Sequence, residues 1–370
     1  RPVDFERSSV TQPPTWGAPP PQGWAPQPPS APWPAPVPPK RGGPWKWLLG
    51  GVALLAVIAV TVVVTVTYMK SQDTKSAGAT SGAASDIASA NDKGPVGIIT
   101  EDPSCGPWSP VATAVAKVED NGWGERDPSI PASAWTPEAR TKYEAVGAAM
   151  REAARQAIPL AKLTPHRVMR ELYGQFIFYS RAYADSISNY GPRDDLLAQV
   201  SATSGDVITN ICAAISSGAA AARVSLVPAI ASPKKFASVG DLSNPAPIFT
   251  KPDTVCANLS PTLDKLLTDP TFKAWASTDA TVPVNDWNTE QQLLTSGVKL
   301  LMTSAANDLA SLAMQSANPT VQDFIMLGVQ YRRTYIESLA TYQPNDNHIY
   351  GAGQYAPGIV SGACDYAAEH

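Results

Sequence analysis

The chain has 370 residues, enough for two domains of ordinary size, and 28 Lys and Arg against 32 Asp and Glu give a net charge of −4. The charge is unevenly spread, because residues 1–100 carry 8 basic and 5 acidic residues, whereas residues 101–370 carry 20 basic and 27 acidic ones. Nucleic-acid binding needs clustered basic side chains that neutralise phosphates. The acidic balance of the longer part therefore argues against nucleic acid as a partner.

A proline-rich stretch lies at the beginning of the chain. Between Pro13 and Pro39, 13 of 27 residues are Pro, and Trp is interleaved at three places. This composition cannot bury a core and favours a solvated polyproline II conformation. We therefore predict a disordered tail over residues 1–44. It is either a docking segment for a cytoplasmic proline-binding partner or a spacer without a partner of its own.

An uncharged apolar run of 19 residues, Leu48 to Val66, follows the tail. At about 1.5 Å per residue it just spans a hydrocarbon core of about 30 Å, and aromatic residues flank both of its ends. We predict a single-pass transmembrane helix within residues 45–69. Three basic residues precede the run and two follow it, which favours a cytoplasmic N-terminus and an extracytoplasmic C-terminal domain. Residues 70–104, rich in Ser, Ala, Gly and Thr at their start, are predicted to form a flexible tether.

The remainder of the chain contains the same segment twice. A shift of 152 positions brings many residues into coincidence and holds one register across separate stretches. The matched positions include Trp135 with Trp287, Met150 with Met302, Tyr183 with Tyr335 and Cys212 with Cys364. We interpret this as a tandem duplication, with helical repeat 1 over residues 105–222, an exposed linker over 223–255 and helical repeat 2 over 256–370.

Helical signals dominate both repeats. Thr136-Pro137-Glu138 combines an N-cap, a proline at the first helical position and an early acid, and it predicts a helix to about Lys162. Further starts are predicted, in chain order, after Ser109-Pro110, at Thr164-Pro165, Asp194, after Ser260-Pro261, at Asn288 and at Asn318-Pro319. No segment shows a sustained strand alternation. We therefore predict an all-α domain made of two units of roughly four helices each.

Four cysteines stand at the ends of the two repeats. Outside the cytoplasm the compartment is oxidising enough for disulfides, and four cysteines allow three pairings. A unit that was once a single domain must have closed its own bridge, which favours Cys105–Cys212 and Cys256–Cys364. The rival pairing would join Cys105 to Cys364 and Cys212 to Cys256. A zinc site would need closely spaced cysteines or histidine partners, which the sequence does not offer, so we predict no metal.

One helix in each repeat carries the candidate binding residues. Its tyrosines recur on a single helical face, and an Arg and an acid four positions apart are placed to pair on its surface. The candidates are Tyr179, Arg181, Tyr183 and Asp185 in repeat 1 and Tyr331, Arg333, Tyr335 and Glu337 in repeat 2. They are either an aromatic and polar cleft for an amphipathic ligand, one per repeat, or a packed helix seam with an ordinary ion pair beside it.

The sequence shows no nucleophile elbow, phosphate-binding loop, zinc-protease motif or dinucleotide fingerprint. We therefore predict no catalytic residues and no cofactor. The order of a Pro/Gly/Trp-rich tail (Pro13 to Pro20), Lys40-Arg41, an apolar run and an Ala/Ser/Thr-rich tether resembles single-pass envelope proteins of actinobacteria, of mycobacterial type above all. That resemblance covers residues 13 to about 90 and implies a cell-envelope protein.

Our leading functional hypothesis is a membrane-anchored envelope binding or accessory protein that is not an enzyme. Its expected partner is another envelope protein, a lipid or a glycan. One alternative is an envelope enzyme that acts on a cell-wall or lipid substrate through a site assembled from dispersed residues. Another is a transmembrane signalling protein that uses the proline-rich tail.

Overall fold

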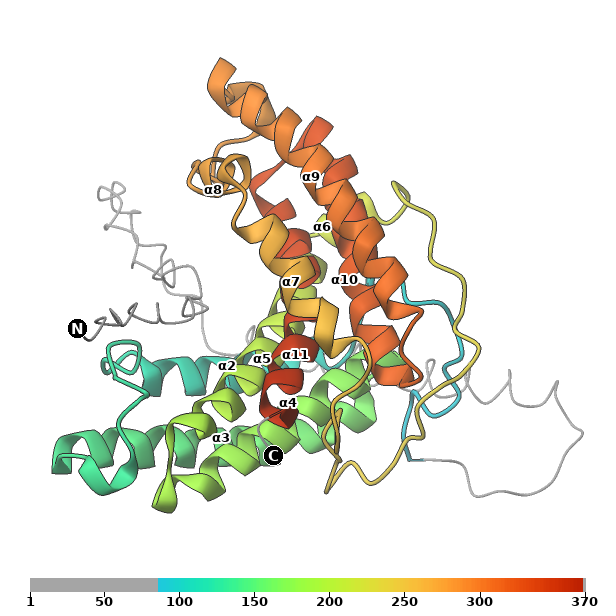
Figure 1. The fold of residues 1–370 in the computed structure, drawn as a ribbon. Coiled ribbons are helices and arrows are strands. Elements are labelled where there is room, and N and C mark those ends of the chain that lie inside the picture. Colours follow the sequence, from blue (N-terminus) through green and yellow to red (C-terminus); the bar gives the residue numbers. More distant parts are fainter. Residues whose placement is uncertain (1–85, 369–370) are drawn as a thin grey trace, which may run out of the picture. The chain divides into compact units, whose positions relative to one another are not determined.

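The computed structural model describes residues 86–368, which are helical and contain no strand (Figure 1). The predicted tail, the predicted transmembrane segment and the first part of the tether lie outside the described residues. The first half holds α2 (Cys105–Glu119), α3 (Pro137–Leu163), α4 (Arg167–Ser186), α5 (Asp195–Ser216) and α6 (Ala219–Arg223). The second half holds α7 (Cys256–Leu267), α8 (Pro270–Ala276), α9 (Thr289–Ala313), α10 (Pro319–Ser338) and α11 (Asn347–Ala368).

The two halves repeat the same local contacts. The hydroxyl of Tyr190 donates to the carbonyl of Pro128 at 2.9 Å, and the hydroxyl of Tyr342 donates to the carbonyl of Ala280 at 2.6 Å. The indole nitrogens behave alike, since Trp135 donates to Ile130 and Trp287 to Val282, each at 2.9 Å. In all four positions the second residue lies 152 places after the first, so the shift seen in the sequence also relates the hydrogen bonds.

The helix starts agree with the capping signals in part. The Thr136 hydroxyl accepts from the backbone N–H of Ala139 at the start of α3, and Asn288 forms a reciprocal capping box at the start of α9. The predicted starts after Ser109 and Ser260 are wrong, because α2 and α7 begin earlier, at the cysteines.

An aspartate explains each of these earlier starts. The Asp102 carboxylate accepts from the backbone N–H of Ser104, and the Asp253 carboxylate accepts from that of Val255. These side-chain turns begin the helical path ahead of the prolines. The predicted start at Thr164 is also displaced, since Thr164 ends α3 and its hydroxyl donates to Asp102, so that α4 begins at Arg167.

Both predicted disulfides are present. Cys105 is bonded to Cys212 and Cys256 to Cys364, with Cα–Cα distances of 5.1 and 5.4 Å. Each bridge joins the first helix of a half to its last long helix, α2 to α5 and α7 to α11. Each half is therefore closed by its own covalent link, and the pairing across the halves is not the one observed.

The halves pack against each other through their last long helices, α5 and α11 (Figure 1). The approach is close, because a Cβ atom on Gly351 of α11 would lie 2.3 Å from the side-chain oxygen of Asn210 on α5, so the Asn210 side chain would have to move. A second contact joins the beginning of α4 to the beginning of α10. The described residues belong to one compact unit, so the two repeats share a continuous core.

Two segments predicted to be loose are packed. Residues 86–104, assigned to the flexible tether, bury Val96, Ile98 and Ile99. The Pro- and Ser-rich linker after α6 buries Leu242, Ile248 and Phe249, so it is not simply exposed. In each case apolar side chains inside a polar stretch supply enough burial to hold the segment against the helices.

No helix within residues 86–368 is both long enough and apolar enough to cross a membrane.

Candidate functional site

The four candidate tyrosines lie in the core. Exposure is 1% for Tyr179, 0% for Tyr183, 0% for Tyr331 and 2% for Tyr335. Tyrosines buried to this degree do not line a surface cleft. Of the two interpretations of this helical face, the packed seam describes the structure, and an aromatic cleft open to an amphipathic ligand does not form there.

The hydroxyls of Tyr331 and Tyr183 differ in whether they form a hydrogen bond. Tyr331 accepts a hydrogen bond of 3.1 Å from the backbone N–H of Ile99, which ties the N-terminal segment to α10. The Tyr183 hydroxyl is buried and has no hydrogen-bond partner among the described residues, and its ring packs edge-on against Trp123 at 6.3 Å. Burial raises the pKa of Tyr183 and of Tyr331, so both side chains stay neutral.

The charged candidates do not pair within their helices as predicted. Asp185 forms an ion pair of 2.5 Å with Arg151 of α3, and Arg181 donates to the carbonyl of Ser243 instead. In the second half Arg333 donates to the side-chain oxygen of Asn307 at 3.1 Å, and Glu337 is exposed. The prediction failed because the neighbouring helix and the linker offer partners that helical spacing alone cannot reveal.

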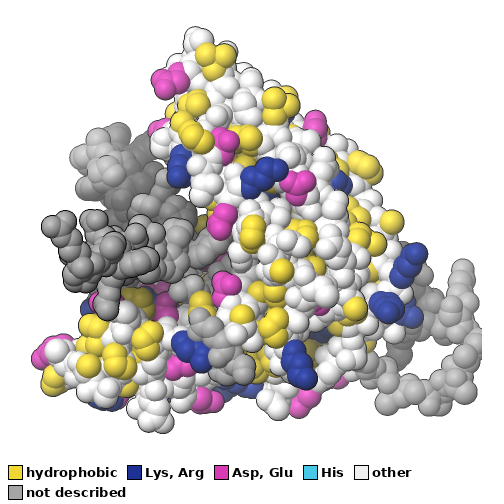
Figure 2. Space-filling model, in the orientation of Figure 1, with side chains coloured by type: hydrophobic (Ala, Val, Ile, Leu, Met, Phe, Trp, Pro, Cys, Tyr) yellow, Lys and Arg dark blue, Asp and Glu magenta, His cyan; other side chains and the backbone are white. Residues whose placement is uncertain are grey.

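Arg181 and Asp185 nevertheless lie together at the surface. With three residues of α3 they line an open depression of about 420 Å³ between α3 and α4. The lining residues are Arg151, Glu152, Arg155, Arg181 and Asp185. Three arginines face two carboxylates, so the depression carries one net positive charge. The space-filling view shows one face of the molecule with acidic and basic side chains scattered rather than gathered into a patch of one sign (Figure 2).

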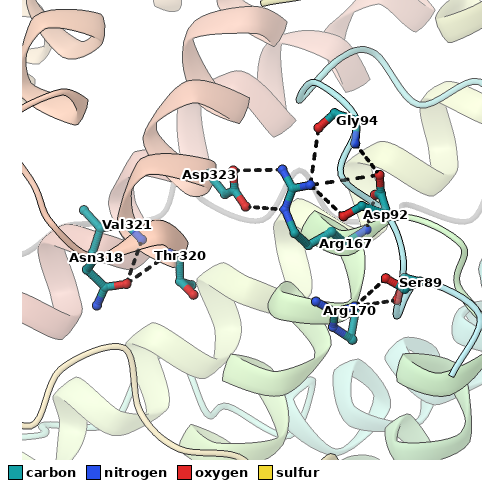
Figure 3. Close-up of polar contacts among 9 residues, drawn as sticks. All are labelled: Ser89, Asp92, Gly94, Arg167, Arg170, Asn318, Thr320, Val321 and Asp323. Carbon is teal, nitrogen blue, oxygen red and sulfur yellow. Dashed lines mark hydrogen bonds and ion pairs between the residues drawn. The ribbon is translucent and has the colours of Figure 1, made fainter. Parts of the chain in front are cut away.

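A second charged cluster is buried where α4, α10 and the N-terminal segment meet (Figure 3). Arg167 on α4 forms a bidentate pair with Asp323 on α10, at 2.7 and 3.1 Å, and the two side chains are only 3% and 2% exposed. The same guanidinium donates to the carbonyl oxygens of Asp92 and Gly94. Arg167 therefore holds both halves and the N-terminal segment at one point.

The pair of acids beside Arg167 is the unusual part of this cluster. Glu171 is buried, and neither of its carboxylate oxygens has a hydrogen-bond partner among the described residues. Burial raises its pKa well above the ordinary value, and the nearby Asp323 raises it further, whereas Arg167 and Arg170 act in the opposite direction. Glu171 and Asp323 lie 152 residues apart, so two acids at equivalent positions of the two halves lie close together.

Sequence reasoning missed this cluster, although the 152-residue register already matched Glu171 with Asp323. Arg170 lies one position before the first acid and donates to the backbone oxygen of Ser89 at 2.8 Å. The signal was an acid recurring near the start of two equivalent helices. The sequence does not indicate that the beginnings of these two helices, α4 and α10, are in contact.

We expect Glu171→Gln to be more stable than the unsubstituted chain at pH 7, with the difference shrinking as the pH falls towards the ordinary Glu pKa of 4.5. Below that pH the carboxyl is protonated in both the folded and the unfolded chain. As the pH rises, the unfolded side chain ionises first, so the folded chain binds more protons and its unfolding free energy falls. Urea unfolding at a series of pH values measures this slope, and a stability difference that does not change with pH would contradict it.

The fold and the clusters define the class of protein, an all-helical domain of two similar halves that are each closed by a disulfide and joined by a buried ion pair. Residues 87–369 match the family described as mycobacterial ESX-1 associated protein, and the chain belongs to that family. It is 45% identical to an uncharacterised protein of Mycolicibacterium smegmatis (strain MKD8), over 372 residues that cover 98% of each chain. No solved structure matches it.

These findings support the mycobacterial part of the resemblance and correct the membrane part. The family's description names an association with ESX-1 and no membrane anchor, and residues 86–368 contain no helix that could span a membrane. The prediction of a single-pass membrane protein is therefore corrected: neither the described residues nor the family's description supports it. The segment on which it was based, residues 45–69, lies outside the described residues.

Proposed function

We propose that this chain is an accessory protein of the ESX-1 secretion system that acts by binding another component of that system. The family to which it belongs carries this association in its description, and the match extends over the whole described domain. We further propose that the domain arose by tandem duplication. The recurrence of the same hydrogen bonds at a spacing of 152 residues supports this origin.

We place the domain in an oxidising compartment outside the cytoplasm. Both pairs of cysteines are bridged, and the described residues contain no free cysteine. Disulfides of this structural kind persist outside the cytoplasm and are rare inside it.

The observation that carries the binding proposal is the open depression between α3 and α4. Arg151 and Asp185 are 53% and 73% exposed, so their ion pair is held weakly and can be exchanged. A carboxylate on a partner can replace Asp185 beside Arg151 and Arg181, with the bidentate geometry that arginine favours. We therefore assign the depression to a protein segment that carries at least one acidic side chain.

A photo-crosslinking amino acid at position 185 tests this proposal in a mycobacterium that carries ESX-1. The matched control is the same amino acid at position 337, which is equally a helix-surface acid in the second half. We expect a crosslink to an ESX-1 component from position 185 and not from 337, and its loss when Arg151 and Arg181 are both replaced by glutamate. No crosslink to an ESX-1 component from position 185 would overturn the proposal.

A further inference from the structure

Two buried arginines of α4 hold the N-terminal segment against the helices (Figure 3). Arg170, which is 3% exposed, donates to the backbone oxygen and to the side-chain oxygen of Ser89, at 2.8 and 3.0 Å. Arg167 donates to the carbonyl oxygens of Asp92 and Gly94, at 3.0 and 3.3 Å. The attachment of this part of the segment therefore depends on where the two guanidinium groups point.

The charges of this cluster balance only when Glu171 carries a proton. Arg167 and Arg170 contribute two positive charges, and Asp92 and Asp323 contribute two negative ones. Glu171 is 8% exposed, and neither of its carboxylate oxygens has a hydrogen-bond partner among the described residues. An ionised Glu171 would thus add a buried charge, without hydrogen bonds, beside the carboxylate of Asp323.

The other described elements around Glu171 bring no buried positive charge to balance its ionised form. Asp323 on α10 repels it, and α5 carries no charged residue after Asp206. The linker presents the ring of Phe236, whose centre lies 4.8 Å from the guanidinium carbon of Arg167. The neighbouring basic side chains are at least partly exposed, namely Lys93 in the N-terminal segment, Lys162 at the end of α3, and Lys234 and Lys235 in the linker.

We propose that Glu171 is a proton-controlled switch that determines whether the N-terminal segment stays bound to α4. Arg167 lies four positions before Glu171 on the helix, and Arg170 precedes it directly, so both guanidinium groups are within reach of its carboxylate. When Glu171 is protonated, the arginines bind the segment and Asp323. When Glu171 ionises, its carboxylate attracts both arginines away from the carbonyl oxygens of the segment, which is then released.

The direction of the switch follows from the linkage between protonation and release. Burial raises the pKa of Glu171 well above the ordinary value of 4.5, whereas the hydrated side chain of the released form has a pKa near that value. Rising pH therefore favours release by about tenfold per pH unit, until the pKa of the bound form is passed. The segment is the only covalent connection between the helices and residues 1–85, so its release lengthens that connection.

Amide hydrogen exchange of the full chain, read by mass spectrometry from about pH 5 to about pH 8, tests this inference. The unsubstituted chain and Glu171→Gln are compared at each pH, so that the pH dependence of the chemical exchange rate cancels. We expect the ratio of their exchange rates in the N-terminal segment to rise at least about tenfold over this range. Exchange in the segment should also respond less to dilute urea than exchange in α11, because release exposes far less surface than global unfolding.

Two variants act as controls for the pH response. Glu144→Gln makes the same chemical change at an exposed position of α3 and should keep the response of the unsubstituted chain. His166→Gln should keep it too, although a histidine can gain a proton in this range and the His166 ring lies 3.0 Å from the carbonyl oxygen of Glu101.

Three results would each overturn the proposal. The first is a ratio of exchange rates that stays constant with pH, because the proton on Glu171 would then not control release. The second is a pH response that disappears in His166→Gln, which would assign the switch to the histidine. The third is an equal urea response of the segment and α11, which would indicate global unfolding in place of release.

Discussion

Asp323→Ala should lower the free energy of unfolding by about 3–5 kcal/mol. The substitution leaves the Arg167 guanidinium, which is 3% exposed, without its bidentate carboxylate in the middle of the domain. Asp92, at 4.0 Å from the same guanidinium, and Glu171, whose pKa falls when Asp323 is removed, compensate only in part. Equilibrium unfolding in urea, followed by circular dichroism, measures the loss. Because the pair joins α4 to α10, the destabilisation should affect both halves together.

Two variants control this measurement. Asp185→Ala breaks the ion pair with Arg151 at the surface, where both side chains are more than half exposed, and should cost at most about 1 kcal/mol. Arg167→Met combined with Asp323→Leu removes both buried charges and should recover much of the stability lost in Asp323→Ala. If Asp323→Ala lowered the unfolding free energy no more than Asp185→Ala does, the buried ion pair would not be what holds the two halves together.

Removing either disulfide by a pair of Cys→Ser substitutions should destabilise the domain by about 2–5 kcal/mol. Each bridge spans more than 100 residues, 107 for Cys105–Cys212 and 108 for Cys256–Cys364. Chain-entropy arguments give nearly the same effect for two loops of nearly the same length. Thermal and urea unfolding of the two double variants measure the loss. Peptide mapping without reductant checks that the remaining bridge is intact.

The difference in stability loss between the two double Cys→Ser variants is a stricter test than either loss alone. Equal losses are expected if each bridge acts mainly by restricting the unfolded chain. A loss confined to one variant would show that one half is held by its packing alone and would contradict the symmetric role given to the two bridges. The unsubstituted chain treated with reductant should lose at least as much stability as either variant.

The features that were predictable from sequence are those fixed locally or by the internal register. The start of α3 at Pro137 follows from a cap and a proline a few residues apart, and the cysteine pairing follows from Cys212 matching Cys364. Helix content was predictable for the same reason, since apolar spacing along one segment determines one face of one helix.

The features that were not predictable depend on which helices meet. Spacing on α4 suggested that Arg181 pairs with Asp185, but α3 supplies Arg151 from 34 residues away. The Arg167–Asp323 pair joins residues 156 apart, and no local pattern indicates that their helix starts touch. The tyrosine face was correctly read as one side of a helix, yet whether that side is a cleft or a core is decided by the elements that cover it.

The N-terminal segment has a consequence for how the domain is made. The backbone of Ala88 donates to the carbonyl of Lys162, but the backbone of Ile99 donates to Tyr331, which lies 232 residues later in the chain. At about 5–20 residues per second, the ribosome delivers Tyr331 roughly ten to fifty seconds after Ile99. Ile99 is thus among the first residues of the domain to be synthesised, yet its contact with Tyr331 cannot form until most of the domain has followed it.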